Sequence, residues 1–256
     1  MIEKIFEKLK KDKFGIYHSL SKKKISYPKD GNQLCYQVED KSFWFQHRNN
    51  VISESVRKYN RENIFFDVGG GNGFVSKRLQ DDGLDAYLIE PGIDGAKNAK
   101  DRGVNNVICA TIQDIGLGQK SIYSIGLFDV VEHIKEDKQF LNDINTYLKD
   151  AGYLYITVPA YDSLWSQEDI DAGHFRRYTL SSMTKILNDS GFKIDVFPKW
   201  LNIVMIVLKG SLVLIPFIIS SIAMFWESNM GIMESGLWNC IWLISLLQII
   251  NYADDK

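Results

Sequence analysis

The sequence predicts an α/β domain in which a doubly wound, mostly parallel sheet carries helices on both faces. Short apolar runs alternate with segments of helical spacing between residues 61 and 199, an order typical of strand–helix–strand units. The chain has 256 residues, of which 45% are hydrophobic, enough for one such domain with additions. We expect three parts: an N-terminal helical cap over residues 1–60, the sheet domain over residues 61–199, and a hydrophobic helical C-terminal region over residues 200–256.

Charge is unevenly distributed along the chain. The formal net charge is −2 at pH 7, yet residues 1–24 contain eight lysines and only three carboxylates. No basic face follows this segment, so the sequence does not favour a nucleic-acid-binding protein. The three cysteines have no metal-ligand or redox spacing, and the first residues lack the apolar run of a secretory signal. Both features predict a cytoplasmic protein.

The first 60 residues are expected to form a basic helix and a cap or lid. Apolar residues recur at helical intervals from Ile2 to Leu9 with lysines between them. They predict an amphipathic helix that either docks on the domain or binds an anionic membrane surface. Residues 25–34 are expected to be a loop. The aromatic residues 43–45 and Arg48 precede a helix ending near Tyr59, and form either a lid whose guanidinium pairs with a carboxylate or part of the core.

A glycine-rich turn follows the first apolar run of the sheet domain. Residues 64–68 predict a buried strand, which runs into the pattern Asp67-x-Gly69-x-Gly71-x-Gly73. Because glycine has no Cβ, such a turn lets a ligand lie against the backbone, although it can also be purely structural. The dinucleotide pattern needs a third glycine where Phe74 stands, and no Gly-Lys-Ser/Thr follows, so neither a dinucleotide fingerprint nor a phosphate-binding P-loop is present.

This turn resembles motif I of the class I S-adenosylmethionine (SAM) methyltransferases. Four further segments look like those of a bacterial subgroup of that class, at residues 128–134, 156–160, 164–166 and 173–179. With the aromatic segment and Arg48, the resemblance covers roughly residues 36–200. It implies a Rossmann-like fold, SAM as cofactor and methyl transfer as the activity, and it does not name the acceptor. Asp67, Gly69, Gly71 and Gly73 are the expected cofactor residues, together with Arg48 and Asp129.

Two more carboxylates are candidates for cofactor contacts. Glu90 ends a second predicted strand at residues 86–90, where an acidic residue accepts hydrogen bonds from ribose hydroxyls. A helix at 93–102 and a strand at 107–109 continue the alternation. Asp114 follows, at a place where this class often has an acidic residue that meets the adenine amino group. A helix-cap or turn role is the alternative for Asp114.

The fourth predicted strand, at residues 122–128, ends in ionisable side chains. Asp129, Glu132 and His133 come directly after it, at the sheet edge where open α/β folds bind ligands. Glu132 and His133 can hold the cofactor region, act as a base, or ligate a metal with Glu90 or Asp129. A capping or turn role is the alternative. One Glu–His pair offers too few ligands to claim a metal, so no metal site is predicted.

A second group of candidates follows the fifth predicted strand, at residues 153–158, and a polar loop at 161–172. His174 is our first choice for the base that deprotonates an acceptor hydroxyl, because histidine titrates near neutrality. His133 is the second choice. Two other candidate catalytic groups are Glu132 and Tyr178. Three side chains are expected to contact the substrate: Trp165, Arg176 and Arg177. Salt bridges to the acidic loop are the alternative for the two arginines.

The composition changes after a predicted helix at 180–189 and a strand at 192–197. Residues 201–226 contain one charge, Lys209, and residues 235–253 contain none. This region forms a membrane-embedded hairpin, a helical subdomain over the active site, or a dimer interface. The resemblance to the methyltransferase subgroup implies helices followed by a final antiparallel strand, and residues 245–252 are the candidate for that strand.

The predicted function is SAM-dependent methyl transfer to a small-molecule, glycan or lipid-linked acceptor, at oxygen. Membrane attachment at the cytoplasmic face is expected through residues 1–24 and 200–252. An NAD-dependent oxidoreductase on the same fold and a non-catalytic, membrane-associated scaffold are the alternatives. The sequence leaves the oligomeric state open.

Overall fold

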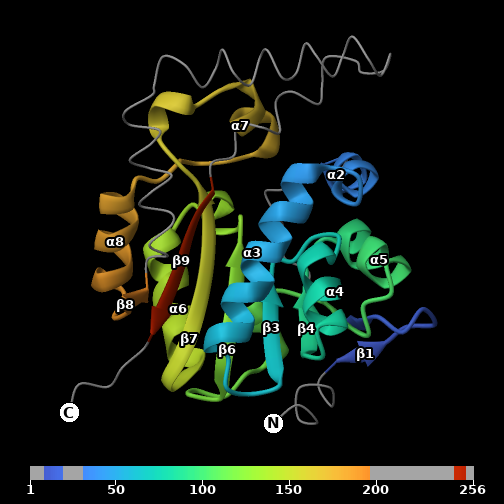
Figure 1. The fold of residues 1–256 in the computed structure, drawn as a ribbon. Helices are drawn as coiled ribbons and strands as arrows, with labels where there is room; N and C mark the ends of the chain where they lie inside the picture. Colours follow the sequence, from blue (N-terminus) through green and yellow to red (C-terminus); the bar gives the residue numbers. More distant parts are fainter. Residues whose placement is uncertain (1–8, 20–30, 197–244, 252–256) are drawn as a thin grey trace. The chain divides into compact units, whose positions relative to one another are not determined.

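The computed structural model describes residues 9–19, 31–196 and 245–251 (Figure 1). The chain divides into two compact units, one made of residues 1–195 with 244–256 and the other of residues 196–243. The second unit lies almost wholly outside the described residues. The account below therefore concerns the first unit.

Nine strands of the described part form a single sheet in the order β1-β2-β5-β4-β3-β6-β7-β9-β8. Their bounds are β1 Lys10–Lys11, β2 Tyr17–His18, β3 Ile64–Val68, β4 Asp85–Ile89, β5 Asn106–Cys109, β6 Ile122–Phe128, β7 Leu148–Pro159, β8 Lys193–Val196 and β9 Ser245–Asn251. The strands from β2 to β7 pair in parallel. β1 is antiparallel to β2, and β9 is antiparallel to β7. The predicted α/β class with a mostly parallel sheet is therefore confirmed.

Strand order reverses at β3, and this reversal positions the site. From β3 the chain moves outward to β4 and β5, then returns to the other side of β3 as β6 and continues to β7. Asp67 of β3 lies opposite Leu88 of β4 and Gly126 of β6. In open α/β sheets the carboxyl ends of the strands at such a reversal bound the ligand crevice.

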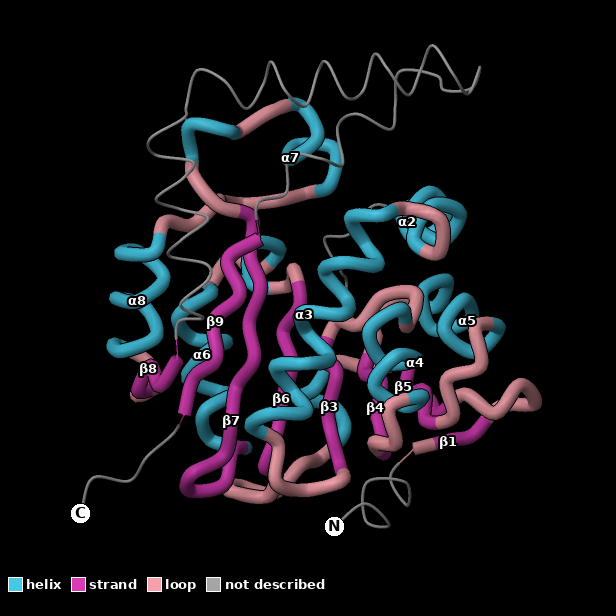
Figure 2. The backbone as a smooth tube through the Cα atoms, in the orientation of Figure 1, coloured by secondary structure: helices cyan, strands magenta, loops and turns pink. Residues whose placement is uncertain are grey.

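Helices cover both faces of the sheet (Figures 1 and 2). Their bounds are α2 Gly31–Glu39, α3 Phe43–Tyr59, α4 Phe74–Asp81, α5 Ile93–Asp101, α6 Asp137–Tyr147, α7 Gln167–Ala172 and α8 Leu180–Asp189, with short 3₁₀ turns η1 Ile112–Ile115, η2 Val131–His133 and η3 Asp162–Leu164. α3 packs on α4, and α2 packs on α5, whereas α6 packs on α8. Apolar side chains of the buried strands, such as Phe65 against Tyr155 at 5.6 Å between ring centroids, fill the space beneath the helices.

Four features differ from the sequence-based prediction. A helix begins at Gly31, where a loop over residues 25–34 was expected, and α3 already begins at Phe43. Residues 167–172 of the expected polar loop form α7. Residues 10–18 form a small hairpin at the sheet edge. Most of the predicted basic helix lies outside the described residues.

The hydrophobic tail remains largely outside the described part as well. Its last segment is the exception, because β9 pairs along β7 from Ser245 opposite Pro159 to Asn251 opposite Tyr153. Among the described residues, no helix combines the length and the apolar character needed to cross a bilayer. The expected membrane attachment through residues 1–24 and 200–252 stays a prediction.

The hairpin provides a test of how its edge is anchored. Ile16 is fully buried and packs in a cluster with Leu88, Ala96, Ala99, Val104 and Val107. Ile16→Ala is expected to lower the free energy of unfolding by about 2–5 kcal/mol, since it leaves a cavity under the sheet edge. Phe14→Ala, in the same hairpin but 60% exposed, is the control and should change it by less than about 0.5 kcal/mol. Urea titration measures both, and equal losses would show that the hairpin is not anchored through Ile16.

Candidate active site

The turn between β3 and α4 contains three glycines with a left-handed backbone, and at two of them a side chain would clash. Gly69, Gly71 and Gly73 have φ angles of 72°, 52° and 75°, in the left-handed region that side chains with a Cβ avoid. A Cβ on Gly69 would lie 2.7 Å from Val130, and one on Gly73 would lie 2.7 Å from Ala99. Gly71 differs, because a Cβ there would meet nothing closer than the Asn32 side chain at 3.7 Å. Its backbone therefore faces open space, as a cofactor cradle requires.

Asp67 lies at the end of β3, beneath this turn. It is fully buried, and its Oδ2 accepts a hydrogen bond of 2.6 Å from Ser76 Oγ on α4. Burial raises the pKa of Asp67 to about 6, although the Ser76 hydrogen bond and the charge of Arg48 oppose the shift. Within the described part, Asp67 Oδ1 has no hydrogen-bond partner. An acceptor atom thus remains for a ligand at the turn.

Glu90 connects the turn to the end of β4. Gly71 N donates to Glu90 Oε2 at 3.0 Å, and Gly92 N donates to Oε1 at 2.6 Å. Burial raises the pKa of Glu90 to about 7, and these two backbone hydrogen bonds only partly offset it. Glu90 therefore directly follows β4 and lies beside the glycine turn, as the sequence predicts. In nucleotide-binding folds this is the sheet edge that faces the ribose.

Sequence reasoning missed a polar cluster that clamps the turn from outside. Asn72 Nδ2 donates to Asn32 O at 2.9 Å, while Asn98 Nδ2 donates to Asn72 Oδ1 at 2.9 Å. Arg102 Nε donates to Asn72 O, and its Nη2 pairs with Glu39 at 2.7 Å. Helices α2 and α5 are thereby fastened to the turn. No local pattern marks these contacts, because they join residues up to 63 positions apart.

Arg48 reaches the opposite strand of the reversal. Its Nη2 lies 2.6 Å from Asp129 Oδ2 and 3.1 Å from Thr157 Oγ1. Thr157 in turn donates to Asp129 Oδ1 at 3.0 Å. Asp129 has a φ of 58°, which aspartate tolerates better than most residues. The carboxylate that pairs with Arg48 is therefore one of the protein's own. Of the described atoms, none is a hydrogen-bond partner of the buried Arg48 Nε.

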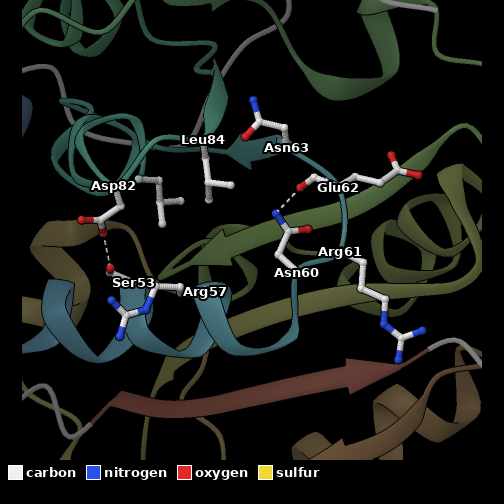
Figure 3. Close-up of a pocket in the computed structure, with 9 residues that line it drawn as sticks. Ser53, Arg57, Asn60, Arg61, Glu62, Asn63, Asp82 and Leu84 are labelled. Carbon is white, nitrogen blue, oxygen red and sulfur yellow. Dashed lines mark hydrogen bonds between the residues drawn. The ribbon is translucent and has the colours of Figure 1, made fainter.

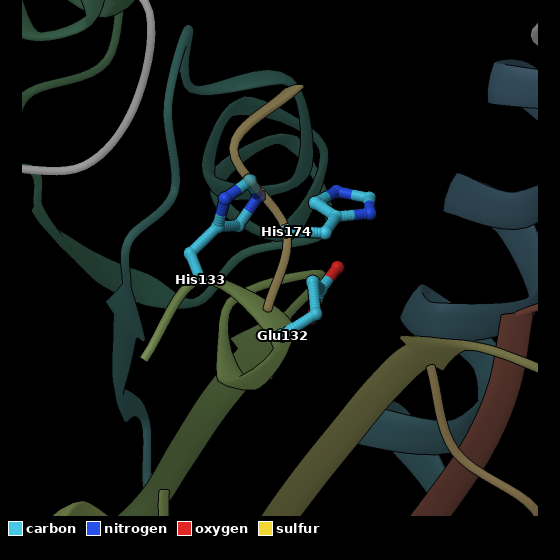
Figure 4. Close-up of side chains that lie close together, drawn as sticks. All are labelled: Glu132, His133 and His174. Carbon is cyan, nitrogen blue, oxygen red and sulfur yellow. The ribbon is translucent and has the colours of Figure 1, made fainter. Parts of the chain in front are cut away.

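Glu132, His133 and His174 converge just beyond the end of β6 (Figure 4). One ligand atom from each of the three lies within 4.8 Å of the others. The two imidazole rings are 4.6 Å apart between centroids, edge to face. Glu132 is fully buried, and neither of its carboxyl oxygens has a hydrogen-bond partner among the residues that the structure describes. The fold thus adds His174 to the Glu–His pair of the sequence.

The electrostatics of these groups follow from burial. Burial raises the pKa of Glu132 well above its usual range, and the nearby Asp129 raises it further. Burial also lowers the pKa of His133 to about 4; the neighbouring His174 adds to this shift, and a hydrogen bond with the Gly173 backbone opposes it. At neutral pH His133 is therefore an uncharged imidazole.

His174 is oriented by a buried carboxylate. Its Nδ1 lies 2.8 Å from Asp169 Oδ1, and Arg177 holds both oxygens of Asp169 through Nε at 2.9 and 3.0 Å. Burial of Asp169 opposes ionisation, but the hydrogen bonds from Arg177 and His174 lower its pKa overall. Arg177 is only 5% exposed. This geometry favours the ion pair with the acidic segment, the alternative that the sequence left open for Arg177.

The remaining candidate residues have the following positions and partners. Arg176 pairs with Asp137 at the start of α6, and its Nη2 donates to Lys135 O. The buried Tyr178 hydroxyl donates to Asp137 at 2.8 Å, and burial raises its pKa. Asp114 accepts a hydrogen bond of 2.6 Å from the side chain of Thr111, the residue before η1. Trp165, at the end of η3, is 39% exposed.

A separate cavity of about 240 Å³ opens at the other end of β3 (Figure 3). Its lining includes Arg57, Asn60, Glu62 and Asp82 from α3, the following loop and the end of α4. Because Asn63 precedes β3, this cavity lies at the amino end of the strand, away from the glycine turn. It contains none of the predicted site residues.

Comparison with known proteins identifies the family. The chain matches the family described as "Methyltransferase domain" over residues 37–195. The chain belongs to this family. It is a SAM-dependent methyltransferase, and its cofactor is S-adenosylmethionine. The family match therefore supports SAM as the cofactor and not NAD. No curated protein matches the chain at a significant level.

Solved structures share the fold of this methyltransferase. A SAM-dependent methyltransferase of Thermotoga maritima, described as a possible histamine N-methyltransferase, has 15% identity and a TM-score of 0.50, with 63% of this chain and 76% of that chain covered. A putative methyltransferase of Bacillus halodurans has 15% identity and a TM-score of 0.52, with 80% and 100% covered. Phosphoethanolamine N-methyltransferase 2 of Haemonchus contortus has 14% identity and a TM-score of 0.56, with 90% and 58% covered. At these identities the likeness establishes the fold alone.

The residues around the turn suit the cofactor. SAM supplies a methyl group on a sulfonium, which a nucleophile displaces. Gly71 leaves room beside the backbone, Asp67 Oδ1 is an acceptor and Arg48 Nε is a donor, and the described part provides neither atom with a partner. A donor and an acceptor are what the carboxylate and ammonium of the cofactor's methionine part require. Glu90 lies beside this turn, at a strand end where nucleotide-binding folds carry an acidic residue that accepts hydrogen bonds from ribose hydroxyls.

The close packing at Gly73 predicts the cost of a side chain in the turn. Gly73→Ala forces a left-handed backbone and a contact of 2.7 Å with Ala99, so it should lower the free energy of unfolding by about 2–4 kcal/mol. Gly83→Ala, which also has a positive φ but open space around its Cα, should cost about 1–2 kcal/mol. Urea titration of both variants measures the difference, and equal costs would contradict the close approach of α4 and α5 at the turn.

Glu90 predicts a pH dependence of stability. Its folded pKa of about 7 exceeds the ordinary value of 4.5, so the folded state binds the proton more tightly and its stabilisation is lost as pH rises from about 4.5 through 7. Glu90→Gln removes this titration. Between pH 5 and pH 8 the variant should therefore gain about 2–3 kcal/mol relative to wild type. Urea titrations at both pH values measure it, with the exposed Glu54→Gln as control; parallel pH profiles of Glu90→Gln and wild type would disprove the raised pKa.

Proposed function

We propose that this methyltransferase transfers the methyl group of SAM to a hydroxyl oxygen of a small-molecule, glycan or lipid-linked acceptor. In this proposal the hydroxyl lies against the group of Glu132, His133 and His174, and it loses its proton there. The glycine turn ends β3, and this group follows β6, so the two lie at neighbouring strand ends of the sheet reversal. A donor methyl group and an acceptor oxygen can meet across that edge.

The observation that supports an oxygen acceptor most directly is the carboxyl group of Glu132. A buried carboxyl group that no described residue hydrogen-bonds is costly in an apolar interior, so a ligand that provides a hydrogen-bond donor or a positive charge would compensate the cost. A hydroxyl provides the donor. Of the two imidazoles beside it, His174 is the candidate proton acceptor, because burial lowers the pKa of His133 to about 4 and makes it a weak base. An oxygen nucleophile needs this deprotonation, which contributes about 10²–10⁴-fold to a rate.

The acceptor can be identified with isotopically labelled cofactor. The protein is incubated with a native extract and SAM that carries a ¹³C-methyl group, and labelled products are isolated by mass spectrometry. The carbon chemical shift then distinguishes a methyl group on oxygen from one on nitrogen or carbon. A labelled methyl ether or ester is the expected product, and a labelled N-methyl amine would overturn the assignment to oxygen.

A matched pair of histidine variants tests the location of the acceptor. His174→Ala should lower kcat with the identified acceptor by about 10²-fold or more while S-adenosylhomocysteine still binds as in wild type by calorimetry. His18→Ala, in the edge hairpin, should leave kcat unchanged. Turnover of His174→Ala at the wild-type rate would remove this group from the reaction.

A further inference from the structure

We propose that Glu132, His133 and His174 form a binding site for one divalent transition-metal cation, to which the acceptor oxygen of the proposed methyl transfer coordinates. The proposal rests on the proposed function only for the role of the cation, whereas the binding site itself follows from the geometry of the three side chains. In this arrangement His174 is a ligand of the cation, in place of the direct proton acceptor that the sequence predicted.

The three side chains are brought together from two separate segments. Glu132 and His133 belong to η2, directly after β6, while His174 follows α7 (Figure 4). Their ligand atoms lie within 4.8 Å of one another. Bonds of about 2 Å to a common cation place two ligand atoms at most about 4 Å apart. Side-chain rotations that close the group by under about 1 Å therefore complete the site.

The backbone around the site keeps the two segments in place. Phe175 N donates to Glu132 O at 2.8 Å, and His174 N donates to Asp169 O at 2.8 Å. Tyr178 pairs by backbone hydrogen bonds with Pro159 and Tyr161 at the end of β7. The segment that carries His174 is therefore fixed to both η2 and the sheet. Binding needs only side-chain movement, because the main chain already brings the ligands together.

Glu132 provides the independent sign of a missing partner. Its side chain is fully buried, and both carboxyl oxygens lack a hydrogen-bond partner in the described residues. Buried carboxylates are normally paired with a cation or hydrogen-bonded. The Nη2 of Arg48 is hydrogen-bonded to Asp129 and Thr157 instead. A cation between Glu132 and the two imidazoles satisfies the carboxylate.

The surroundings of His174 match those of a metal ligand. Its Nδ1 is bonded to Asp169 Oδ1 at 2.8 Å, and Arg177 fixes that carboxylate from the other side. When Nδ1 donates to a carboxylate, Nε2 carries the lone pair, and metal-bound histidines are oriented in this way. Asp169 and Arg177 are then positioning residues for the site.

The ligand set indicates the kind of cation. Two imidazoles and one carboxylate suit Zn²⁺, Mn²⁺ or Fe²⁺, and they are a poor match for Mg²⁺ or Ca²⁺, which prefer oxygen ligands. Three protein ligands leave open coordination positions, as in catalytic sites. An acceptor hydroxyl bound there loses its proton to solvent, because the cation stabilises the oxyanion. The oxygen then forms a bond to the methyl carbon as the carbon–sulfur bond breaks, which releases neutral S-adenosylhomocysteine.

Metal binding can be measured without any acceptor. The full chain is treated with a chelator and titrated with Zn²⁺ by calorimetry, and Mn²⁺ binding is followed by its electron paramagnetic resonance signal. We expect one Zn²⁺ per chain in wild type. Glu132→Gln and the double variant His133→Ala/His174→Ala should weaken Zn²⁺ binding by at least about 100-fold, and Asp169→Asn by about 10–100-fold.

Controls separate this site from adventitious binding and from misfolding. Cys35→Ser/Cys109→Ser removes the two described thiols, and His18→Ala removes a histidine at the sheet edge; both should bind Zn²⁺ as wild type does. Unchanged binding of S-adenosylhomocysteine by Glu132→Gln shows that the variant is folded. Equal Zn²⁺ affinity of Glu132→Gln and wild type, or loss of binding only in the cysteine variant, would overturn the site.

Failure of the cation site and failure of the proposed function give different results. Zn²⁺ bound through Glu132 without any oxygen-methylated product would remove the hydroxyl acceptor and leave the cation site. Oxygen methylation at the wild-type rate in chelator-treated protein and in Glu132→Gln would remove the role of the cation and leave the hydroxyl acceptor.

Discussion

The rest of the site depends on a backbone constraint at the turn from β3 to α4. Three glycines with positive φ pass between Val130 on one side and Ala99 on the other, so no side chain can be accommodated at two of them. The turn is then held by hydrogen bonds: Gly71 N binds Glu90 at the end of β4, and Asn72 binds residues of α2 and α5. A cofactor site made of backbone needs this rigidity, because its shape is the shape of the main chain.

The second half of the site is built from side chains and relies on pairing. Arg48 of α3 binds Asp129 beyond β6, and Arg177 binds Asp169 on α7. Each pair is largely shielded from solvent, so breaking one by removal of a single partner leaves a buried charge. The first pair fixes the end of β6 to α3, and the second fixes the segment that carries His174 to α7. Ion pairs therefore fix the side chains of Asp129 and Asp169, whereas close packing and hydrogen bonds fix the glycine turn.

Much of the fold could be predicted from local sequence signals. The bounds of β3, β6 and α8 agree with prediction because each is an apolar or amphipathic run that ends at glycine, acidic or polar residues. Asp67 and Glu90 could be placed at one site because acidic residues that end neighbouring parallel strands share a sheet edge. Ion pairs between residues far apart in the chain could not be predicted in the same way. A sequence contains Arg177, Asp169 and Asp137 without indicating which pairs form.

Two misses had different causes. The hairpin at residues 10–18 has strands of two residues, too short for any periodicity to be recognised. Helix α7 did carry a local signal, since Ser166 and Asp169 form a capping box three residues apart, and that pattern is readable in sequence. Recognising this capping box would have placed Asp169 in a helix, where the structure pairs it with His174.

The place of β9 has a consequence for biosynthesis. This strand lies between β7 and β8 in the sheet, yet residues 197–244 separate it from β8 along the chain. While the ribosome is still making that interval, β7 has no neighbour on its outer side, although every residue of the cofactor turn has already emerged. An uncovered strand edge of this kind invites pairing with other chains. Nascent molecules thus pass through a period in which the cofactor half can fold but the sheet is still incomplete.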